Sequence, residues 1–185
     1  DVVSRVRRLA ATRKVGHAGT LDPMATGLLT VGVGKATRLL NYLVGADKTY
    51  EATIRLGVGT DTEDAHGQVT QVVAPGQVDL GRLQAAAAQL TGPISQVPSS
   101  FSAIKVNGVR AYDLARSGQE VELEARQVTI HSFDLGQVNS TSASYPGWGQ
   151  VPVVDVKVQV SCSSGTYIRA LARDFGLSLQ TVAHL

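Results

Sequence analysis

An alternating stretch near the C-terminal end constrains the fold of this chain most strongly. Between Val151 and Cys162, the segment VDVKVQV alternates apolar with polar residues. A period of two places successive side chains on opposite faces of a strand, which is typical of a half-exposed sheet. We therefore expect this segment to be a strand with one face on a core and the other toward solvent.

Other segments predict a mixture of strands and helices. Strands are predicted for Leu28 to Val33, Tyr50 to Leu56, Gln68 to Val73 and Val128 to Leu135. Helices are predicted for Val2 to Leu9, Ala36 to Leu43, Asp79 to Leu90 and Thr166 to Phe175. The turn-rich GVGTDTEDAHG predicts a hairpin between the second and third of these strands. Strands joined by hairpins, with interspersed helices, favour an α+β fold with a largely antiparallel sheet over a doubly wound fold.

Two stretches carry weaker signals. Residues 94–119 mix turn chemistry with basic and aromatic side chains, which indicates a mobile surface excursion. The small residues from Ser140 to Gly149 indicate a loop. With 185 residues, 43% of them hydrophobic, the chain is long enough for one well-buried domain or two lobes sharing a core. We expect a single domain over residues 1–185.

The charges are distributed unevenly along the chain. Residues 1–48 hold eight Lys or Arg and only three acidic residues, whereas the whole chain has a net charge of +2. Such a basic segment suits an anionic partner such as nucleic acid, although solvated surface arginines explain it equally well. The absence of a long apolar run and of a secretory pattern predicts a cytoplasmic protein. The single cysteine, Cys162, excludes an internal disulfide and predicts a small buried residue at a strand end.

Several apparent motifs do not fit the chemistry they suggest. LLTVGVGKAT has Leu29 where a phosphate-binding loop needs glycine, and Ala36 where that loop needs Ser or Thr. Asp61, Glu63, Asp64 and His66 could bind a cation, but the cluster lacks the spacing of a calcium loop. We favour a turn-forming role for these residues, because Asp side chains often bond to their own backbone.

The stretch GHAGTLDPMATG, residues 16–27, places one carboxylate, Asp22, among glycines and next to Pro23. Proline disfavours the helical region for the residue before it, so the backbone at Asp22 should be extended. The glycines permit tight bends or the close approach of a ligand. Taken alone, a role in shaping the turn is the stronger interpretation, and presentation of the carboxylate is the alternative.

Four blocks of sequence, taken together, favour the second interpretation, in which the turn presents the carboxylate. In chain order they are KVGHAGTLDPMATGLL, DKTYEATIRLGVGTDTEDAHG, QVPSSFSAIKVNGVRAYDLAR and CSSGTYIRALARDFG. The four blocks resemble the hallmark segments of the TruB family of tRNA pseudouridine synthases. The resemblance implies the pseudouridine synthase fold, a mixed and largely antiparallel sheet flanked by helices with a thumb-like insertion. It also implies a catalytic core trimmed at both ends, without the family's first strand and C-terminal PUA domain.

The resemblance further implies an activity and its central residues. Family members isomerise a uridine in the T-loop of tRNA, uridine 55, to pseudouridine. By position, Asp22 corresponds to the nucleophile, Arg169 to the arginine that pairs with it, and Tyr50 to the tyrosine that lies on the target base. The reaction transfers no electrons, so neither a cofactor nor a metal is implied. From its own context, Arg169 could instead be a surface residue that pairs with Asp174 or lies beside Arg173.

The remaining implied contacts are substrate-binding residues. His17 resembles the histidine that fills the space left by the flipped uridine, and Tyr167 resembles a residue that contacts the base. Lys14, Lys105 and Arg110 are candidate phosphate contacts, and the segment around Lys105 resembles a flexible thumb. Each has an ordinary alternative: a turn spacer for His17, a core position for Tyr167, and solvated charges for the three cations.

Two classes of function remain open. The first is an RNA-modifying isomerase that acts on the T-arm of tRNA. The second is a noncatalytic tRNA-binding or chaperoning module that uses the same basic cleft. The pair of Asp22 and Arg169 favours the enzyme, because phosphate binding gains nothing from a carboxylate in a basic region. We expect a monomer.

Overall fold

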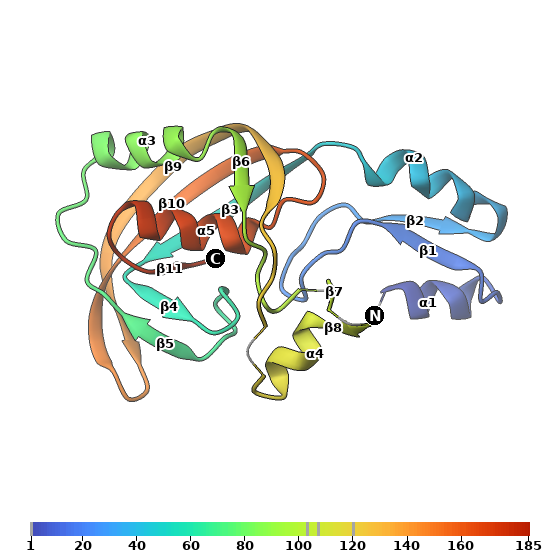
Figure 1. Ribbon diagram of the computed structural model, residues 1–185, viewed down its shortest axis with the longest axis horizontal. Coiled ribbons are helices and arrows are strands. Elements are labelled where there is room, and N and C mark those ends of the chain that lie inside the picture. The colour runs from blue at the N-terminus through green and yellow to red at the C-terminus, as the bar shows by residue number, and fades with distance from the viewer. Residues whose placement is uncertain (1, 103, 107, 120) are drawn as a thin grey trace. The chain divides into compact units, whose positions relative to one another are not determined.

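The computed structural model describes residues 2–102, 104–106, 108–119 and 121–185 (Figure 1). The chain divides into two compact units, Asp1–Asp47 and Lys48–Leu185. Within the described residues, no helix combines the length and the apolar character needed to cross a membrane.

The first unit is a small hairpin with helical turns. Its elements are α1 (Val2–Leu9), β1 (Val15–Ala18), β2 (Thr30–Val33), the 3-10 helix η1 (Gly34–Leu40) and α2 (Asn41–Val44). β1 and β2 pair antiparallel, with Val15 opposite Val33. Leu40 packs closely on this hairpin because Gly32 has no side chain: a Cβ there would lie 3.0 Å from Leu40 Cγ. In place of the single helix predicted for Ala36 to Leu43, the structure has two short helices, η1 and α2.

The second unit is built on a five-stranded sheet of order β11-β3-β10-β9-β6, in which all neighbours pair antiparallel. Its strands are β3 (Lys48–Leu56), β6 (Gly92–Gln96), β9 (Arg126–Tyr145), β10 (Gly149–Cys162) and β11 (Ala183–His184). α3 (Leu80–Gln89) and α5 (Ile168–Ser178) contribute to the core of this unit. The predicted α+β class with antiparallel pairing is confirmed.

The central strand β10 has the predicted alternation. Val156, Val158 and Val160 are buried, whereas Lys157 and Gln159 between them are exposed. The buried valines belong to one core cluster with side chains of α3 and α5. Phe133 of β9 and Phe175 of α5 meet there, with ring centroids 5.2 Å apart. Cys162 ends β10 fully buried, as predicted.

The prediction that Tyr50 to Leu56 and Gln68 to Val73 pair as a hairpin is wrong for the first of these strands. β3 pairs with β10 and β11, and the hairpin lies between β4 (Val58–Thr60) and β5 (Val69–Val72). Strand β3 ends before Gly57, whose φ of 105° lies in the region that favours glycine. A Cβ at Gly57 would lie 2.8 Å from the Pro152 carbonyl oxygen, so this close crossing also requires glycine.

The loop predicted for Ser140 to Gly149 is also wrong. β9 continues to Tyr145 and β10 begins at Gly149, and only a tight turn joins them. The Trp148 N–H donates to the Tyr145 carbonyl at 3.0 Å and closes this turn. Pairing with β10 determines the backbone here, and small polar residues are tolerated because most side chains on this part of β9 are exposed.

Residues 97–119, here called the thumb segment, follow β6. They contain β7 (Lys105–Val106), β8 (Val109–Arg110) and α4 (Ala111–Arg116). The first three residues of the predicted excursion, 94–96, belong instead to the edge strand of the main sheet. The mobility of the thumb segment stays a prediction.

Candidate active site

Arg169 occupies the second position of α5 and is buried, with an exposed fraction of 7%. One guanidinium nitrogen donates to the Thr62 carbonyl at 2.9 Å, and the other donates to the Phe101 carbonyl at 2.9 Å. These two carbonyls come from the β4–β5 turn and from the thumb segment. The guanidinium is therefore oriented by backbone groups from two distant parts of the chain. The alternative of a surface arginine is wrong.

Arg173, one helical turn after Arg169, makes the ion pair that the alternative had assigned to Arg169. Its guanidinium lies 2.9 Å from Asp174 Oδ1 and 2.7 Å from Glu63 Oε1, and it donates to the Val97 carbonyl at 2.8 Å. Burial lowers the pKa of Arg173, but the attraction of Glu63 and Asp174 outweighs this and leaves the pKa raised. Two arginines on α5 thus hold the same two segments.

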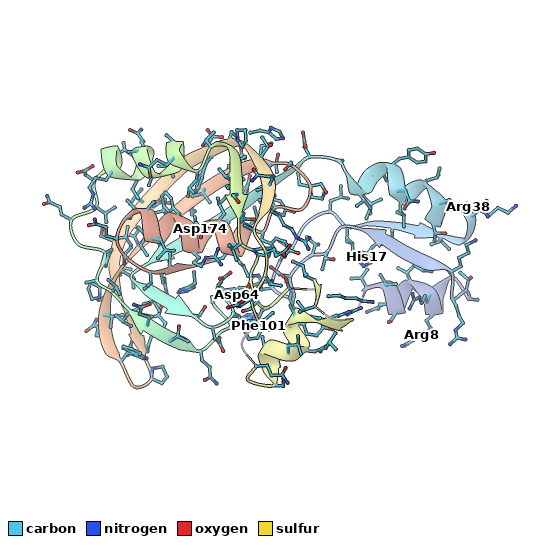
Figure 2. All side chains as sticks on the ribbon, viewed as in Figure 1. Arg8, His17, Arg38, Asp64, Phe101 and Asp174 are labelled. Atoms are coloured by element: carbon cyan, nitrogen blue, oxygen red, sulfur yellow. The ribbon has the colours of Figure 1, made fainter. Side chains whose placement is uncertain are left out.

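The β4–β5 turn has an internal hydrogen-bond network. Buried Asp64 accepts from the Thr62 hydroxyl at 2.7 Å and from the His66 N–H at 3.0 Å. These contacts match the turn-forming role favoured from the sequence. The network fixes the peptide whose carbonyl receives Arg169. Asp64 and Phe101, labelled in Figure 2, mark the two segments that meet the guanidinium.

Tyr50 and Tyr167 lie in the same unit as Arg169. Tyr50 is on β3 opposite Val160, is half-buried and packs against the main core. Tyr167 is half-buried and is the N-cap residue of α5, two positions before Arg169. The sequence predicted Tyr167 inside this helix, but Tyr167 immediately precedes its first residue, Ile168.

The thumb segment carries a basic cluster. Lys105 on β7 and Arg110 on β8 are exposed and directly opposed in this short antiparallel pair. The Arg110 guanidinium lies 5.7 Å and the Arg116 guanidinium 5.6 Å from the centre of the Tyr112 ring. Arg110 also donates to the Tyr112 hydroxyl at 2.9 Å. Tyr112 holds these two cations close together through cation–π contacts, so positive charge gathers at β8 and α4.

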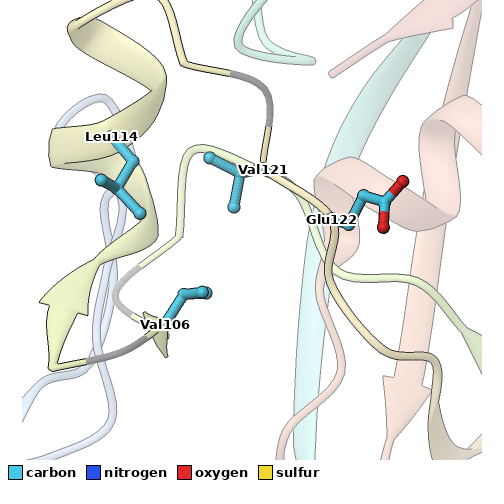
Figure 3. A pocket seen from close by; sticks show the side chains of 4 residues that line it. All are labelled: Val106, Leu114, Val121 and Glu122. Carbon is cyan, nitrogen blue, oxygen red and sulfur yellow. The ribbon is translucent and has the colours of Figure 1, made fainter.

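A pocket of about 340 Å³ lies in the same region (Figure 3). Its lining residues are Val106, Leu114, Val121 and Glu122. The pocket contains none of the residues singled out from the sequence. Two of its three apolar side chains, Val106 and Leu114, belong to the thumb segment, and Val121 follows it.

In the first unit, Asp22 stands at the first position of a tight turn. Its carbonyl accepts a hydrogen bond from the Ala25 N–H at 2.9 Å, and Pro23 occupies the second position, where proline is favoured. The Asp22 residue is half-buried, whereas residues 23–28 are exposed. The predicted turn is confirmed. A turn and a presented carboxylate are compatible, because the turn uses the backbone of Asp22.

The other residues singled out in this unit lie on or beside β1. His17 is exposed on β1, and its Nδ1–H donates to the Gly19 carbonyl. Lys14 is exposed and immediately precedes β1. Figure 2 labels His17 together with Arg8 on α1 and Arg38 on η1, two further exposed positions. α1 has no buried residue, and Arg5 and Arg8 are exposed on it, whereas Arg7 donates to the Val15 carbonyl at 3.2 Å.

The structure thus places the predicted residues in two groups. Tyr50, Tyr167 and Arg169 belong to the second unit, with Lys105 and Arg110 on its thumb segment. Asp22, His17 and Lys14 belong to the first unit. The pairing of Asp22 with Arg169 joins the two units and stays a prediction. The carbonyls that hold Arg169 were missed, because no local pattern marks a contact across 107 or 68 residues.

Comparison with known families identifies the chain. The profile of "TruB family pseudouridylate synthase (N terminal domain)" matches residues 7–168. The match covers the first three blocks and the first seven residues of the fourth, and it ends immediately before Arg169. The chain belongs to the TruB family. Membership accounts for the joint occurrence of the Asp22 turn, the β4–β5 turn and the thumb segment.

Similar proteins support this assignment. The chain is 60% identical over 185 residues to tRNA pseudouridine synthase B of Arthrobacter sp. (strain FB24), and it covers 58% of that protein. It is 54% identical to tRNA pseudouridine synthase B of Thermobifida fusca (strain YX), covering all of this chain and 61% of that one. The chain therefore spans about three fifths of these TruB-family relatives.

A solved structure shares the fold. It is described as a crystal structure of a Cbf5-Nop10-Gar1 complex, and it aligns with a TM-score of 0.66 and 26% identity. The alignment covers 99% of this TruB-family chain and 41% of the matched chain.

Proposed function

We propose that this chain is the catalytic domain of a tRNA pseudouridine synthase that isomerises uridine 55 in the T-loop of tRNA. Membership of the TruB family and the names of its relatives support this activity. The structural observation that carries the proposal is the buried Arg169, fixed by two carbonyls at the beginning of α5. A buried guanidinium held in one orientation suits the recognition of a carboxylate.

In the proposed reaction, Asp22 is the nucleophile. An ionised carboxylate is competent for this role. Asp22 forms a transient bond to C6 of the base or to C1′ of the ribose, and this bond breaks again when the product forms. The bond between N1 of the base and C1′ of the ribose breaks, the base rotates, and a bond between C5 and C1′ forms. C5 loses its proton and N1 gains one, so atoms and charge balance without an oxidant or a reductant.

Arg169 is the proposed partner of the Asp22 carboxylate. A cation in the first turn of a helix is disfavoured by the helix dipole, so a nearby anion lowers the electrostatic cost. Bidentate pairing would keep the Asp22 carboxylate ionised and aim it at the nucleoside. The Thr62 and Phe101 carbonyls would hold the guanidinium in place for this contact.

The target uridine must leave its stack before attack, which costs a few kcal/mol. Tyr50 is the proposed stacking surface for the extruded base and a relay for the C5 proton. Tyr167 is a second proposed contact with the base. His17 is proposed to fill the space that the uridine vacates in the RNA.

The cations supply the proposed electrostatic attraction for the T-arm. Lys14 precedes β1, and Lys105 and Arg110 lie side by side on the thumb segment. Contacts with phosphates give affinity that is independent of sequence and sensitive to salt. The exposed arginines of α1 add to this attraction.

Tritium release from tRNA labelled at C5 of uridine tests the proposal. We expect the complete protein to release one tritium per tRNA, and none when uridine 55 is replaced by cytidine. A filter-binding assay on the same samples separates catalysis from affinity. Tight binding of tRNA without any release would support a noncatalytic tRNA-binding module and contradict the proposal.

A further inference from the structure

We propose that Gln96 is a positioning residue for Tyr167, and through it for the base-binding end of α5. The inference deepens the proposed function and rests on it where the base is concerned. Gln96 is the last residue of the edge strand β6 and is almost completely buried, with an exposed fraction of 1%. Gln96 is the first residue of the third block quoted above, but no role is implied for it there.

The side-chain amide of Gln96 binds both backbone groups of Tyr167. Its Oε1 accepts from the Tyr167 N–H at 2.9 Å, and its Nε2 donates to the Tyr167 carbonyl at 3.2 Å. The two residues are 71 positions apart in the sequence. Among side chains, this paired donor and acceptor geometry matches an amide, whereas a carboxylate lacks the donor and a hydroxyl lacks the reach.

The N–H and carbonyl of Tyr167 lie at the beginning of α5, where backbone groups need hydrogen-bond partners from outside the helix. Tyr167 has no side-chain cap, and its φ and ψ of −104° and 107° are extended, so its N–H precedes the helical hydrogen-bond ladder. The Tyr167 carbonyl already accepts from the Leu171 N–H at 3.0 Å, and the amide of Gln96 adds a second bond. Gln96 therefore determines where α5 begins and how the peptide of Tyr167 is oriented.

The same stretch of chain also reaches the later positions of α5. The Val97 carbonyl accepts from Arg173, and the Phe101 carbonyl accepts from Arg169. Gln96 makes the first of these contacts and makes it through its side chain, as Ser99 does when its hydroxyl accepts from Arg169 at 3.5 Å. A substitution can therefore remove it while leaving the backbone contacts of Val97 and Phe101 available.

Gln96→Met is the direct test, because methionine has a similar length and no amide. In the complete protein, we expect kcat on tRNA to fall by roughly tenfold or more, because a displaced catalytic group has a large effect on rate. We expect KM to stay within about threefold, because most tRNA affinity comes from phosphate contacts elsewhere. If the methionine variant does not fold, Gln96→Asn, one methylene too short, replaces it.

A measurement independent of activity reports on Tyr167 itself. In protein labelled with 3-fluorotyrosine, the fluorine resonance of Tyr167 is assigned by its loss in Tyr167→Phe. We expect Gln96→Met to shift or broaden this resonance and to leave that of Tyr42, in the other unit, unchanged. An unchanged Tyr167 resonance would overturn the inference whether or not the protein is a synthase.

Val153→Ala is the matched control for stability. Val153 is fully buried in a second core cluster with Val58 and Val151, apart from the cluster that contains α5. We expect this variant to lower the melting temperature while retaining kcat and the Tyr167 resonance. If it lowered kcat as much as Gln96→Met does, the effect of Gln96 would be one of stability, and the inference would be wrong. Failure of the proposed function would remove the kcat readout but leave the fluorine readout intact.

Discussion

Arg173 and Glu63 form an ion pair of 2.7 Å between α5 and the β4–β5 turn, which are 110 residues apart in sequence. The side chains are 27% and 16% exposed. Glu63 has a positive φ of 59°, which is uncommon for a residue with a side chain. The pair therefore holds a strained turn in place, next to the Thr62 carbonyl that receives Arg169.

Replacement of this arginine should weaken the fold. We expect Arg173→Gln to lower the free energy of unfolding by about 1–3 kcal/mol, because it leaves the carboxylate of Glu63 half-buried without its cation. Denaturant titration measures the change. Arg126→Gln, at an exposed position of β9, is the control and should change stability by less than about 0.5 kcal/mol. Equal effects of the two substitutions would contradict the structural role of the pair.

The contacts of Arg169 and Arg173 illustrate what the sequence could not predict. Local patterns gave α1, α3, β10 and the beginning of α5 within a few residues, because capping and periodicity are properties of neighbouring residues. Asp79, the first residue of the predicted helix, caps α3 and accepts from the Arg82 N–H at 2.8 Å. No local sequence pattern marks the carbonyls of Thr62 and Phe101 as contacts of Arg169, because every residue has a backbone carbonyl.

The errors in strand pairing have the same origin. The break at Gly57 separates β3 from β4 by one residue, and periodicity cannot detect so short an interruption. The partner of β3 is then decided by β10, about 100 residues later. For the site, the family resemblance supplied the roles of Asp22 and Tyr50, which their local sequence leaves ambiguous.

Gly57 should not tolerate a side chain. We expect Gly57→Ala to destabilise the protein by about 2 kcal/mol or more, because of its positive φ and the close approach of the Pro152 carbonyl. Gly45→Ala is the matched control, since Gly45 has a φ of −80° and no atom within 4 Å of an added Cβ. Thermal unfolding distinguishes the two. A Gly57→Ala protein as stable as the control would show that β3 and β4 are connected differently.

His184 should make stability depend on pH. It is 4% exposed, its Nδ1–H donates to the Val58 carbonyl at 2.8 Å, and burial lowers its pKa below the usual 6.5. The unfolded chain therefore binds a proton near pH 6.5 while the folded chain does not. This part of the stability is fully present above the usual pKa of 6.5 and is lost progressively as the pH falls below it, with a slope of at most about 1.4 kcal/mol per unit.

Denaturant titrations from pH 8 to pH 5 measure this slope. We expect His184→Gln to flatten the dependence by roughly one proton. A wild-type profile that stays flat between pH 7 and pH 5, or a slope that is unchanged in His184→Gln, would argue against a neutral buried His184.

The basic thumb segment should contribute salt-dependent affinity. We expect Lys105→Gln and Arg110→Gln each to weaken tRNA binding, and each to reduce the slope of log K against log salt by roughly 0.7–0.9. Filter binding over a salt series measures both quantities. Lys157→Gln, on an exposed position of β10, provides the control. Weaker binding with an unchanged slope would mean that neither side chain contacts a phosphate.

Asp22→Asn tests the central claim most directly, because the amide keeps the size of the side chain and removes the negative charge of the nucleophile. Asp79→Asn is the matched control, since Asn caps a helix as well as Asp does. Tritium release from C5-labelled tRNA is measured for both variants alongside tRNA affinity. We predict that Asp22→Asn abolishes release while binding tRNA within a few-fold of wild type, and that Asp79→Asn releases tritium normally. Substantial release by Asp22→Asn would contradict the account.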